Sequence, residues 1–372
     1  MQALVLSGGG ARAAYQVGVI AAIAERAPSV HFPIISGVSA GAINATSLAA
    51  HRGTLAEAVA ELQGHWRGLE ADHVYRVRPT SLTLFSTRRL LMAAIGRSPG
   101  PAELPGLLDL TPLRVFLGRA IAFENIDANI VTGRLRALAL TATPYSTAAT
   151  TTFVQGPPDI PMWRRTERIS IRASITLDHV MASAAIPILF PAVWLGNDFY
   201  ADGSVRQTAP LAPSIHLGAS HLMVVGMQRT RRPTQSHRPH TQYPTAAEGM
   251  GLLFSAIFHD ALDADAARVE RINRLVESLT PRSAAPERLR HINVLHLKPS
   301  RDLSSFVPSE RRKMPAIMRW IVRAMGGDAR RAAMFVSYLL FDPGFTGLLM
   351  ESGYEDAVAG WSGIERFLES VG

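Results

Sequence analysis

The chain has 372 residues, of which 47% are hydrophobic and 18% charged, and its formal net charge is +8. This composition excludes a disordered chain and a protein that is wholly embedded in a membrane. Because the chain has no cysteine, disulfides, cysteine-based metal sites and thiol nucleophiles are excluded as well.

The chain opens with a predicted buried strand over residues 3–6 and a predicted helix over residues 13–27, joined by a glycine-rich turn. No basic stretch precedes the strand, which argues against a cleaved signal peptide. In the turn, the consecutive N–H groups of Gly8, Gly9 and Gly10 can point together at an anion. The turn is therefore a candidate anion-binding site.

Three kinds of anion site are open for this turn. A phosphate P-loop requires Gly-Lys-Ser/Thr at its end, whereas this turn continues with Ala11-Arg12. A dinucleotide site fits the Gly-x-Gly-x-x-Ala spacing that starts at Gly8, but residues 27–56 contain no Asp or Glu to bind a ribose. An oxyanion hole for acyl transfer is the third kind, and it gains from the serine turn that follows.

The second predicted strand, residues 34–36, leads into Gly37-Val38-Ser39-Ala40-Gly41 and then into a helix. On such a strand–turn–helix, a nucleophile elbow, the serine takes a strained backbone and its hydroxyl projects into solvent. Gly37 and Gly41 leave room for the close approach of strand and helix. The free N–H groups and positive dipole at the helix start favour an alkoxide at Ser39 and an oxyanion beside it. Taken alone, the motif also fits an ordinary Gly/Ser turn.

The later part of the chain continues to alternate between predicted strands and helices, which favours an α/β fold. Residues 75–110 interrupt the pattern with prolines, glycines and arginines. We interpret them as an inserted cap or lid, with a plain connecting segment as the alternative. The other predicted elements are helices over residues 55–69, 177–185 and 246–279, and strands over residues 135–143, 150–155, 222–227 and 291–297.

Asp202 is a further candidate for chemistry, since it follows a short apolar strand and precedes Gly203. A buried carboxylate within hydrogen-bond reach of Ser39 could take the hydroxyl proton directly. An ordinary aspartate of a β-turn is the alternative.

A Ser-His-Asp arrangement is the other serine-hydrolase hypothesis, and it needs a histidine late in the chain. None of the late histidines sits in a recognisable loop context, so we favour a serine–aspartate pair. Acidic residues and histidines do not cluster at metal-ligand spacing, and we expect neither a metal nor a cofactor. The late histidines are His216, His221, His259, His291 and His296.

Four segments, taken together and in this order, resemble the patatin-like phospholipase family. That family shows a glycine-rich turn followed by Arg or Lys, then Gly-x-Ser-x-Gly, then Asp-Gly-Gly or Asp-Gly-Ala. The resemblance covers roughly residues 3–227, and Ser204 departs from it, because the family most often has glycine or alanine there. The four segments are Gly8-Gly9-Gly10-Ala11-Arg12, Gly37-Val38-Ser39-Ala40-Gly41, Ala182-Ser183-Ala184-Ala185-Ile186-Pro187-Ile188-Leu189-Phe190-Pro191 and Asp202-Gly203-Ser204.

The resemblance implies a hydrolase of lipid acyl esters that uses a serine–aspartate dyad without histidine. Ser39 would be the nucleophile and Asp202 the general base. The N–H groups of the glycine turn would bind the oxyanion, and Arg12 would brace that turn or the oxyanion region. The substrate would be a phospholipid or a lysophospholipid. The alternatives are a Ser-His-Asp carboxylesterase and a non-catalytic, membrane-associated regulatory protein with a vestigial site.

The resemblance also implies a patatin-like catalytic domain, which we expect over residues 1–300. Its fold would be a three-layer α/β/α sandwich with a mostly parallel central sheet, and the cap or lid would be an insert in it. Residues 301–372 read as a helical C-terminal extension, on which the family motifs say nothing.

A lipid substrate requires contact with a membrane surface, and two features fit such contact. The positive charge comes almost entirely from arginine, which suits anionic headgroups, although genome composition is another source of this usage. Residues 314–325 carry apolar side chains at helical spacing, with arginines and Trp320 among them, which is the composition of an interfacial helix. Packing of the same stripe on the protein's own core or on a partner subunit is the alternative.

Patterns that the sequence lacks argue against two further features, a nucleic-acid partner and a membrane-spanning helix. No zinc-finger, RNA-binding aromatic or basic-zipper pattern accompanies the positive charge, so we expect no nucleic-acid partner. No run of about 18 apolar residues occurs, so we expect no membrane-spanning helix. We therefore expect a cytoplasmic protein with peripheral membrane contact, and the sequence leaves its oligomeric state open.

Overall fold

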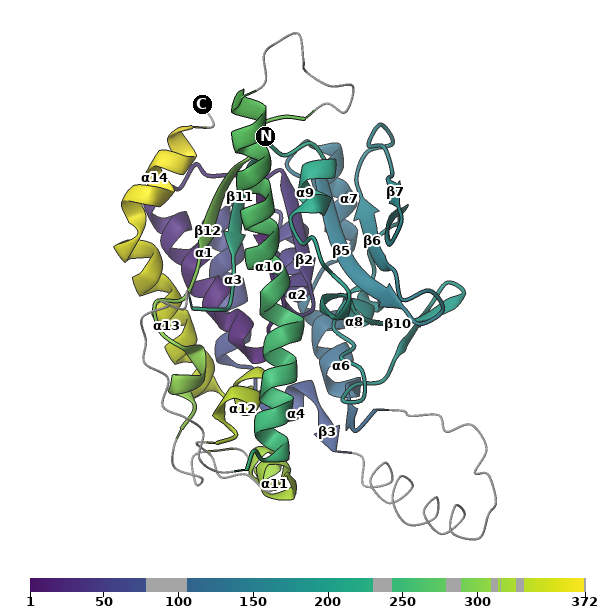
Figure 1. The fold of residues 1–372 in the computed structure, drawn as a ribbon, viewed down its shortest axis with the longest axis vertical. Helices are drawn as coiled ribbons and strands as arrows, with labels where there is room; N and C mark the ends of the chain where they lie inside the picture. Colours follow the sequence, from purple (N-terminus) through teal and green to yellow (C-terminus); the bar gives the residue numbers. More distant parts are fainter. Residues whose placement is uncertain are drawn as a thin grey trace.

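The structure is a computed structural model, which describes residues 1–77, 106–229, 243–278, 289–308, 314, 316–325 and 331–370. Its centre is a mostly parallel sheet with helices against both faces (Figure 1). This arrangement confirms the predicted α/β sandwich. Most of the expected cap or lid lies outside the described residues, which resume at Gly106.

The parallel part of the described sheet runs in the order β12, β11, β1, β2 and β5. β2, the next strand in the chain, lies on one side of β1, and the late strands β11 and β12 lie on the other side. β1 is therefore the point at which the strand order reverses, the switch point of the topology. Ligands of such sheets bind beyond the carboxyl ends of the strands at this point. These strands are β1 (Gln2–Leu6), β2 (Ile34–Val38), β5 (Ala137–Pro144), β11 (His221–Val225) and β12 (Asn293–Leu297).

The sheet continues beyond β5 with mixed pairing. β6 runs antiparallel to β5, β8 runs parallel to β6, and β7 is antiparallel to β8. A hairpin of β9 and β10 pairs with the end of β5, and β3 and β4 form a separate two-stranded sheet. Their bounds are β3 (Arg76–Val77), β4 (Leu108–Asp109), β6 (Thr150–Gln155), β7 (Arg164–Arg165), β8 (Arg168–Arg172), β9 (Val193–Leu195) and β10 (Asp198–Asp202).

Helices cover both faces of the sheet (Figure 1). On one face lie α1 (Ala14–Arg26), α2 (Ala40–Ala50), α3 (Leu55–Arg67) and α13 (Pro343–Ala359), and on the other lie α9 (Ala212–His216) and the long α10 (Ala246–Ser278), close to its predicted bounds. The other described helices are α4 (Ala71–Val74), α6 (Thr111–Ala120), α7 (Glu124–Val131), α8 (Leu177–Ser183), α11 (Ala316–Ala324), α12 (Ala333–Leu339) and α14 (Trp361–Glu369).

The side chains of β1 alternate between two buried clusters, one on each face. Leu4 and Leu6 belong to the larger cluster, which includes α1, α2 and α13. Ala3 and Val5 belong to the smaller cluster, to which α10 contributes Leu262. Successive side chains of a strand point to opposite faces, so an apolar run such as Ala3–Leu6 is the pattern of a strand covered on both sides.

The C-terminal helices pack on the N-terminal part of the chain. α13 lies along α1, and the Tyr15 hydroxyl of α1 donates a hydrogen bond to Asp356 Oδ2 of α13 at 3.0 Å. Phe345 and Leu349 of α13 are buried in the same cluster as Tyr15. The predicted helices of residues 301–372 are thus present, and the domain division at residue 300 stays a prediction.

The apolar stripe that includes α11 is directed into the protein. Met314, Met318 and Val322 are buried in the larger cluster, whereas Trp320 is 45% exposed and Arg319 faces outward. The stripe thus packs on the protein's own core at these positions, and membrane contact stays a prediction. Among the described residues no single helix has the length and apolarity to cross a membrane. One bent pair, α12 with α13 at 96°, meets these criteria by length and composition.

Candidate active site

Ser39 occupies the turn between β2 and α2 in a backbone conformation that L-residues rarely adopt. Its φ is 56° and its ψ is −130°, in a region that costs free energy for any residue with a Cβ. The Ser39 N–H donates to Ser183 Oγ at 3.0 Å, and Ser183 Oγ donates to the Thr141 carbonyl at 2.7 Å. Ser183, whose role the sequence analysis did not identify, therefore helps to hold the strained turn against β5.

Ser39 is only 2% exposed, so the expectation that its hydroxyl projects into solvent is wrong. The turn is closely packed. A Cβ on Gly37 would collide with the Gly41 carbonyl oxygen, and a Cβ on Gly41 would collide with the Leu6 carbonyl oxygen and lie 2.5 Å from that of Ser7. Glycine at both positions therefore permits the contact of β2, α2 and β1.

Asp202 reaches Ser39 through the register of β5. Along one edge of β5, β2 ends with Val38 opposite Thr141, and β10 arrives from the other direction with Asp202 opposite Ala142. Because β6 occupies the other edge of β5 at these positions, β2 and β10 share one edge and meet end to end. The residue that follows β2 and the last residue of β10 are thereby brought together.

The Asp202 carboxyl is fully buried, and burial raises its pKa to about 6. Three donors oppose this effect of burial, because they favour the ionised carboxylate and lower the pKa. They are the Ser39 hydroxyl, the Ser204 N–H and the Ser204 hydroxyl. Oδ1 accepts the Ser204 N–H at 2.8 Å, whereas Oδ2 has no partner with full hydrogen-bond geometry. The contact with the Ser39 hydroxyl is therefore long or poorly aligned, and such contacts often tighten only when substrate binds.

The glycine turn lies directly over this pair. A Cβ on Gly8 would be 3.0 Å from Ser39 Cβ and 2.6 Å from Ser204 Oγ, so only a residue without a side chain fits there. Within the described part of the chain, the N–H groups of Gly8 and Gly9 donate to no backbone or side-chain acceptor. Gly10, with a φ of 56°, turns the chain into α1. The turn thus has free donors close to the serine.

Buried polar side chains connect the glycine turn to the helix that follows Ser39. Gln16 Nε2 donates to the Ser7 carbonyl at 2.9 Å, and Asn44 Nδ2 donates to Gln16 Oε1 at 2.9 Å. Trp66 Nε1 donates to Asn44 Oδ1 at 2.9 Å. The sequence analysis missed this network, for which the only signal is an amide side chain among the mainly apolar residues of α1 and of α2.

Arg12 is buried beneath the glycine turn and is directed at α12. Its Nε donates to Ser337 Oγ at 2.8 Å, its Nη2 donates to the Met334 carbonyl at 3.3 Å, and the guanidinium lies 4.0 Å from the centre of the Tyr338 ring. Burial lowers the pKa of this guanidinium. Of the two roles left open for Arg12, these contacts favour bracing of the turn.

Replacing Arg12 with methionine is expected to lower the free energy of unfolding by about 2 kcal/mol, because lost hydrogen bonds to a charged group outweigh the relief of a buried charge. Arg12→Lys should not restore stability, since an ammonium lacks the planar fork. Urea unfolding measures both. The matched control is Arg26→Met, because the exposed Arg26 guanidinium lies 5.4 Å from the centre of the Trp361 ring. This replacement should lower the free energy of unfolding by less than about 1 kcal/mol. Equal losses at both positions would contradict the bracing role.

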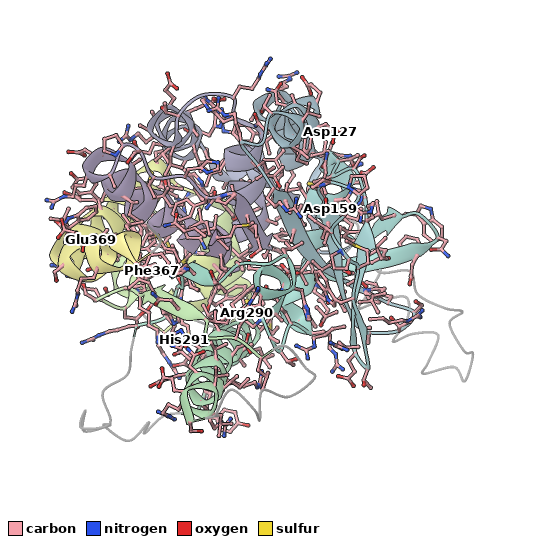
Figure 2. All side chains as sticks on the ribbon, turned by 90° about the horizontal axis from the view of Figure 1, so that it is seen from above. Asp127, Asp159, Arg290, His291, Phe367 and Glu369 are labelled. Atoms are coloured by element: carbon pink, nitrogen blue, oxygen red, sulfur yellow. The ribbon has the colours of Figure 1, made fainter. Side chains whose placement is uncertain are left out.

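Four of the late histidines have described side chains, and these four do not gather at this pair. His221 begins β11 opposite Gln2 of β1, and His291, labelled in Figure 2, stands two residues before β12, so both lie at the amino ends of these strands. His216 stacks on Trp163, with ring centres 4.7 Å apart. His296 lies toward the carboxyl end of β12, 3.6 Å from Asp263, and burial lowers its pKa to about 4. The side chain of His259 is outside the described part of the structure.

An apolar cavity lies beside the serine turn. Ala40, the residue after Ser39, forms part of its wall with side chains of α2, α3 and α6, and the cavity volume is about 40 Å³. Its polar lining is negligible, which suits an alkyl chain. Among the described residues no three acidic or histidine side chains come together as a metal site. Other residues of the wall are Ile43, Leu62, Trp66, Phe116 and Phe341.

Comparison with known proteins gives one family match. The model of the family described as "Patatin-like phospholipase" matches residues 4–215, more than half of the chain. No curated protein matches in a sequence search.

The similar solved structures are distant. The crystal structure of VipD from Legionella pneumophila is 14% identical with a TM-score of 0.33, and the alignment covers 95% of this chain and 67% of VipD. The crystal structure of the type III effector protein ExoU is 14% identical with a TM-score of 0.32, covering 94% of this chain and 53% of ExoU. The structure of the heterodimeric ExoU–SpcU complex from the type III secretion system of Pseudomonas aeruginosa is 13% identical with a TM-score of 0.28. This alignment covers 91% of this chain and 68% of the matched chain. The chain therefore spans about half of the ExoU length in one of these matches.

Proposed function

The chain belongs to the patatin-like phospholipase family, and from that premise we propose that it hydrolyses acyl ester bonds of phospholipids or lysophospholipids, with Ser39 as nucleophile and Asp202 as general base. One observation carries the proposal: a fully buried carboxyl lies against the hydroxyl of a strained serine, beneath a turn whose Gly8 and Gly9 N–H groups donate to no acceptor among the described residues. These are the parts that acyl transfer requires.

In the first half of the reaction, Asp202 takes the hydroxyl proton of Ser39 while the serine oxygen attacks the carbonyl carbon of the ester. The carbonyl oxygen becomes an oxyanion, to which the N–H groups of Gly8, Gly9 and Gly10 donate. Collapse of this tetrahedral species breaks the bond to the leaving alcohol, which receives the proton from Asp202. The acyl group is then esterified to Ser39.

In the second half, Asp202 takes a proton from a water molecule, and the hydroxide attacks the acyl carbon. The same N–H groups stabilise the second oxyanion. When the tetrahedral species collapses, Ser39 leaves as the alcohol and regains its proton from Asp202. The products are a fatty acid and the starting enzyme, so no cofactor is consumed.

The apolar cavity at Ala40 supports a substrate with an alkyl chain. It begins at the residue next to the nucleophile and its wall is built from leucine, isoleucine and aromatic side chains. Burial of each CH₂ group that the cavity admits contributes about 0.8 kcal/mol, so an ester whose acyl chain reaches into it should bind more tightly than an acetyl ester.

Labelling with a fluorophosphonate probe tests the proposal. Mass spectrometry should find the probe on Ser39, because only an activated serine reacts with it. The labelling rate should fall about tenfold per pH unit below about pH 6, since the Asp202 carboxyl is protonated there and cannot act as base. Absence of label on Ser39 in the folded protein would exclude the proposed mechanism and would favour the non-catalytic alternative.

A further inference from the structure

Two neighbouring polar atoms beside the serine are buried without a partner of full hydrogen-bond geometry. They are Oδ2 of Asp202 and Oγ of Ser204, a residue that is 8% exposed. Unpaired buried polar atoms are rare in folded proteins, because they have lost water without gaining another partner. A donor and an acceptor left together in this way point to a contact that forms during function.

The backbone already directs Ser204 at the carboxyl. Asp202 Oδ1 accepts the Ser204 N–H at 2.8 Å across the short 3-10 helix Gly203–Val205, which fixes the two residues relative to each other. The Ser204 hydroxyl is also near enough to act on the Asp202 carboxyl and to lower its pKa. Since a hydroxyl rotates freely and an ionised carboxylate has about four lone-pair sites, it can accept from Ser39 and Ser204 together.

We propose that Ser204 is a positioning residue for Asp202: the Ser204 hydroxyl donates to the carboxylate and keeps it ionised, and therefore able to accept a proton, in a fully buried site. The inference rests on the proposed function, because it assigns Asp202 the role of base. It also gives a use to the serine that stands where the family most often has glycine or alanine. The hydroxyl lies against the glycine turn, 2.6 Å from the position of a Cβ on Gly8, so it is held inside the site.

Within the described residues, the elements packed around Asp202 supply few other charges. β5 contributes Thr141 and Thr143, and α8 contributes Ser183 and His179, whose pKa burial lowers, so it is neutral at pH 7. Of the charged side chains that the structure describes on the nearby elements, six have partners of their own. These pairs are Arg206 with Glu167, Arg268 with Asp265, Lys298 with Asp263, Arg114 with Asp178, Asp198 with Ser146, and Arg12 with Ser337.

The pH dependence of Ser39 labelling distinguishes a positioning role from a structural one. The acid limb is the pH below which the labelling rate falls. Loss of the hydroxyl in Ser204→Ala should raise this pH by roughly one unit, from about 6 toward 7, because one hydrogen bond to the carboxylate is gone. The labelling rate should then fall about twofold at pH 7 and about fivefold at pH 6, and it should be unchanged at pH 9. Ser204→Gly should shift the limb in the same direction.

Ser214→Ala is the matched control, since Ser214 is a buried serine whose hydroxyl is 2.9 Å from Ser36 Oγ, away from Asp202. Its acid limb should stay where it is in the unchanged protein. If that protein is labelled at Ser39 with a limb near pH 6 and both Ser204 variants keep that limb, the role of Ser204 is wrong and the proposed function stands. If Ser39 is not labelled in any of the proteins, the proposed function itself fails.

Discussion

Replacing Ser39 with alanine is expected to reduce ester hydrolysis by four orders of magnitude or more, roughly the loss seen when a serine hydrolase loses its nucleophile. The remaining glycine turn and Asp202 cannot form an acyl-enzyme, so only background hydrolysis is left. The fold should be preserved, because alanine keeps the Cβ at the same strained turn. Turnover of a short-chain p-nitrophenyl ester and release of fatty acid from a lysophospholipid measure the effect.

The matched control for this change is Ser36→Ala. Ser36 is also a buried serine of β2, but its hydroxyl contacts Ser214 instead of Asp202. Its turnover should remain within about twofold of the unchanged protein, since the Ser36 hydroxyl has its contact with Ser214 and takes no part in the proposed chemistry. Equal turnover in the unchanged protein and in Ser39→Ala would remove the enzyme proposal and leave a regulatory protein with a vestigial site.

Replacing Asp202 with asparagine should greatly reduce activity and stabilise the fold at the same time. Without the base, turnover should fall by roughly 10³- to 10⁴-fold. Burial raises the pKa of Asp202 from 3.8 to about 6 in the folded protein, so ionising it there costs about 1.36 kcal/mol for each unit of the shift. Above pH 6 the unchanged protein carries this whole cost, whereas asparagine carries none. We expect a gain of about 2–3 kcal/mol in the free energy of unfolding at pH 7.5.

The gain in the free energy of unfolding should depend on pH, and this dependence identifies the Asp202 carboxyl as its source. As pH falls from 6 to 4, the folded protein takes up a proton at Asp202 before the unfolded chain does, so the unchanged protein regains stability and the difference from Asp202→Asn should shrink. Urea unfolding at a series of pH values measures this. Asp198→Asn on the same strand is the control, because Asp198 is only partly buried and should give no such gain. A stability difference that stays constant with pH would contradict the assignment.

Much of this fold could be predicted from the sequence, because the informative signals are local. The glycine turn, the Ser39 turn and the Asp202 turn each lie within a few residues, and buried strands such as β1 read as short apolar runs. The family and the α/β sandwich followed from these segments and are confirmed by the family match and the structure.

The rest depends on contacts between distant parts of the chain, which no local pattern encodes. Ser183 bonds to a residue 144 positions earlier, and Arg12 bonds to a residue 325 positions later. The meeting of Ser39 with Asp202 depends on the register of β10 on β5, which is a property of the sheet. Likewise, the helical spacing of the apolar residues at α11 predicts an amphipathic helix. The same spacing fits a helix covered by protein and a helix covered by lipid, so it cannot distinguish the two.

The bond from Arg12 to α12 has a consequence for any shortened form of the protein. A fragment trimmed to the family match at residues 4–215 would retain every sequence motif of the site and lose Ser337, Met334 and Tyr338. The guanidinium under the glycine turn would then have neither acceptors nor an aromatic ring. Motif content alone is therefore a poor guide to the minimal active length of this chain.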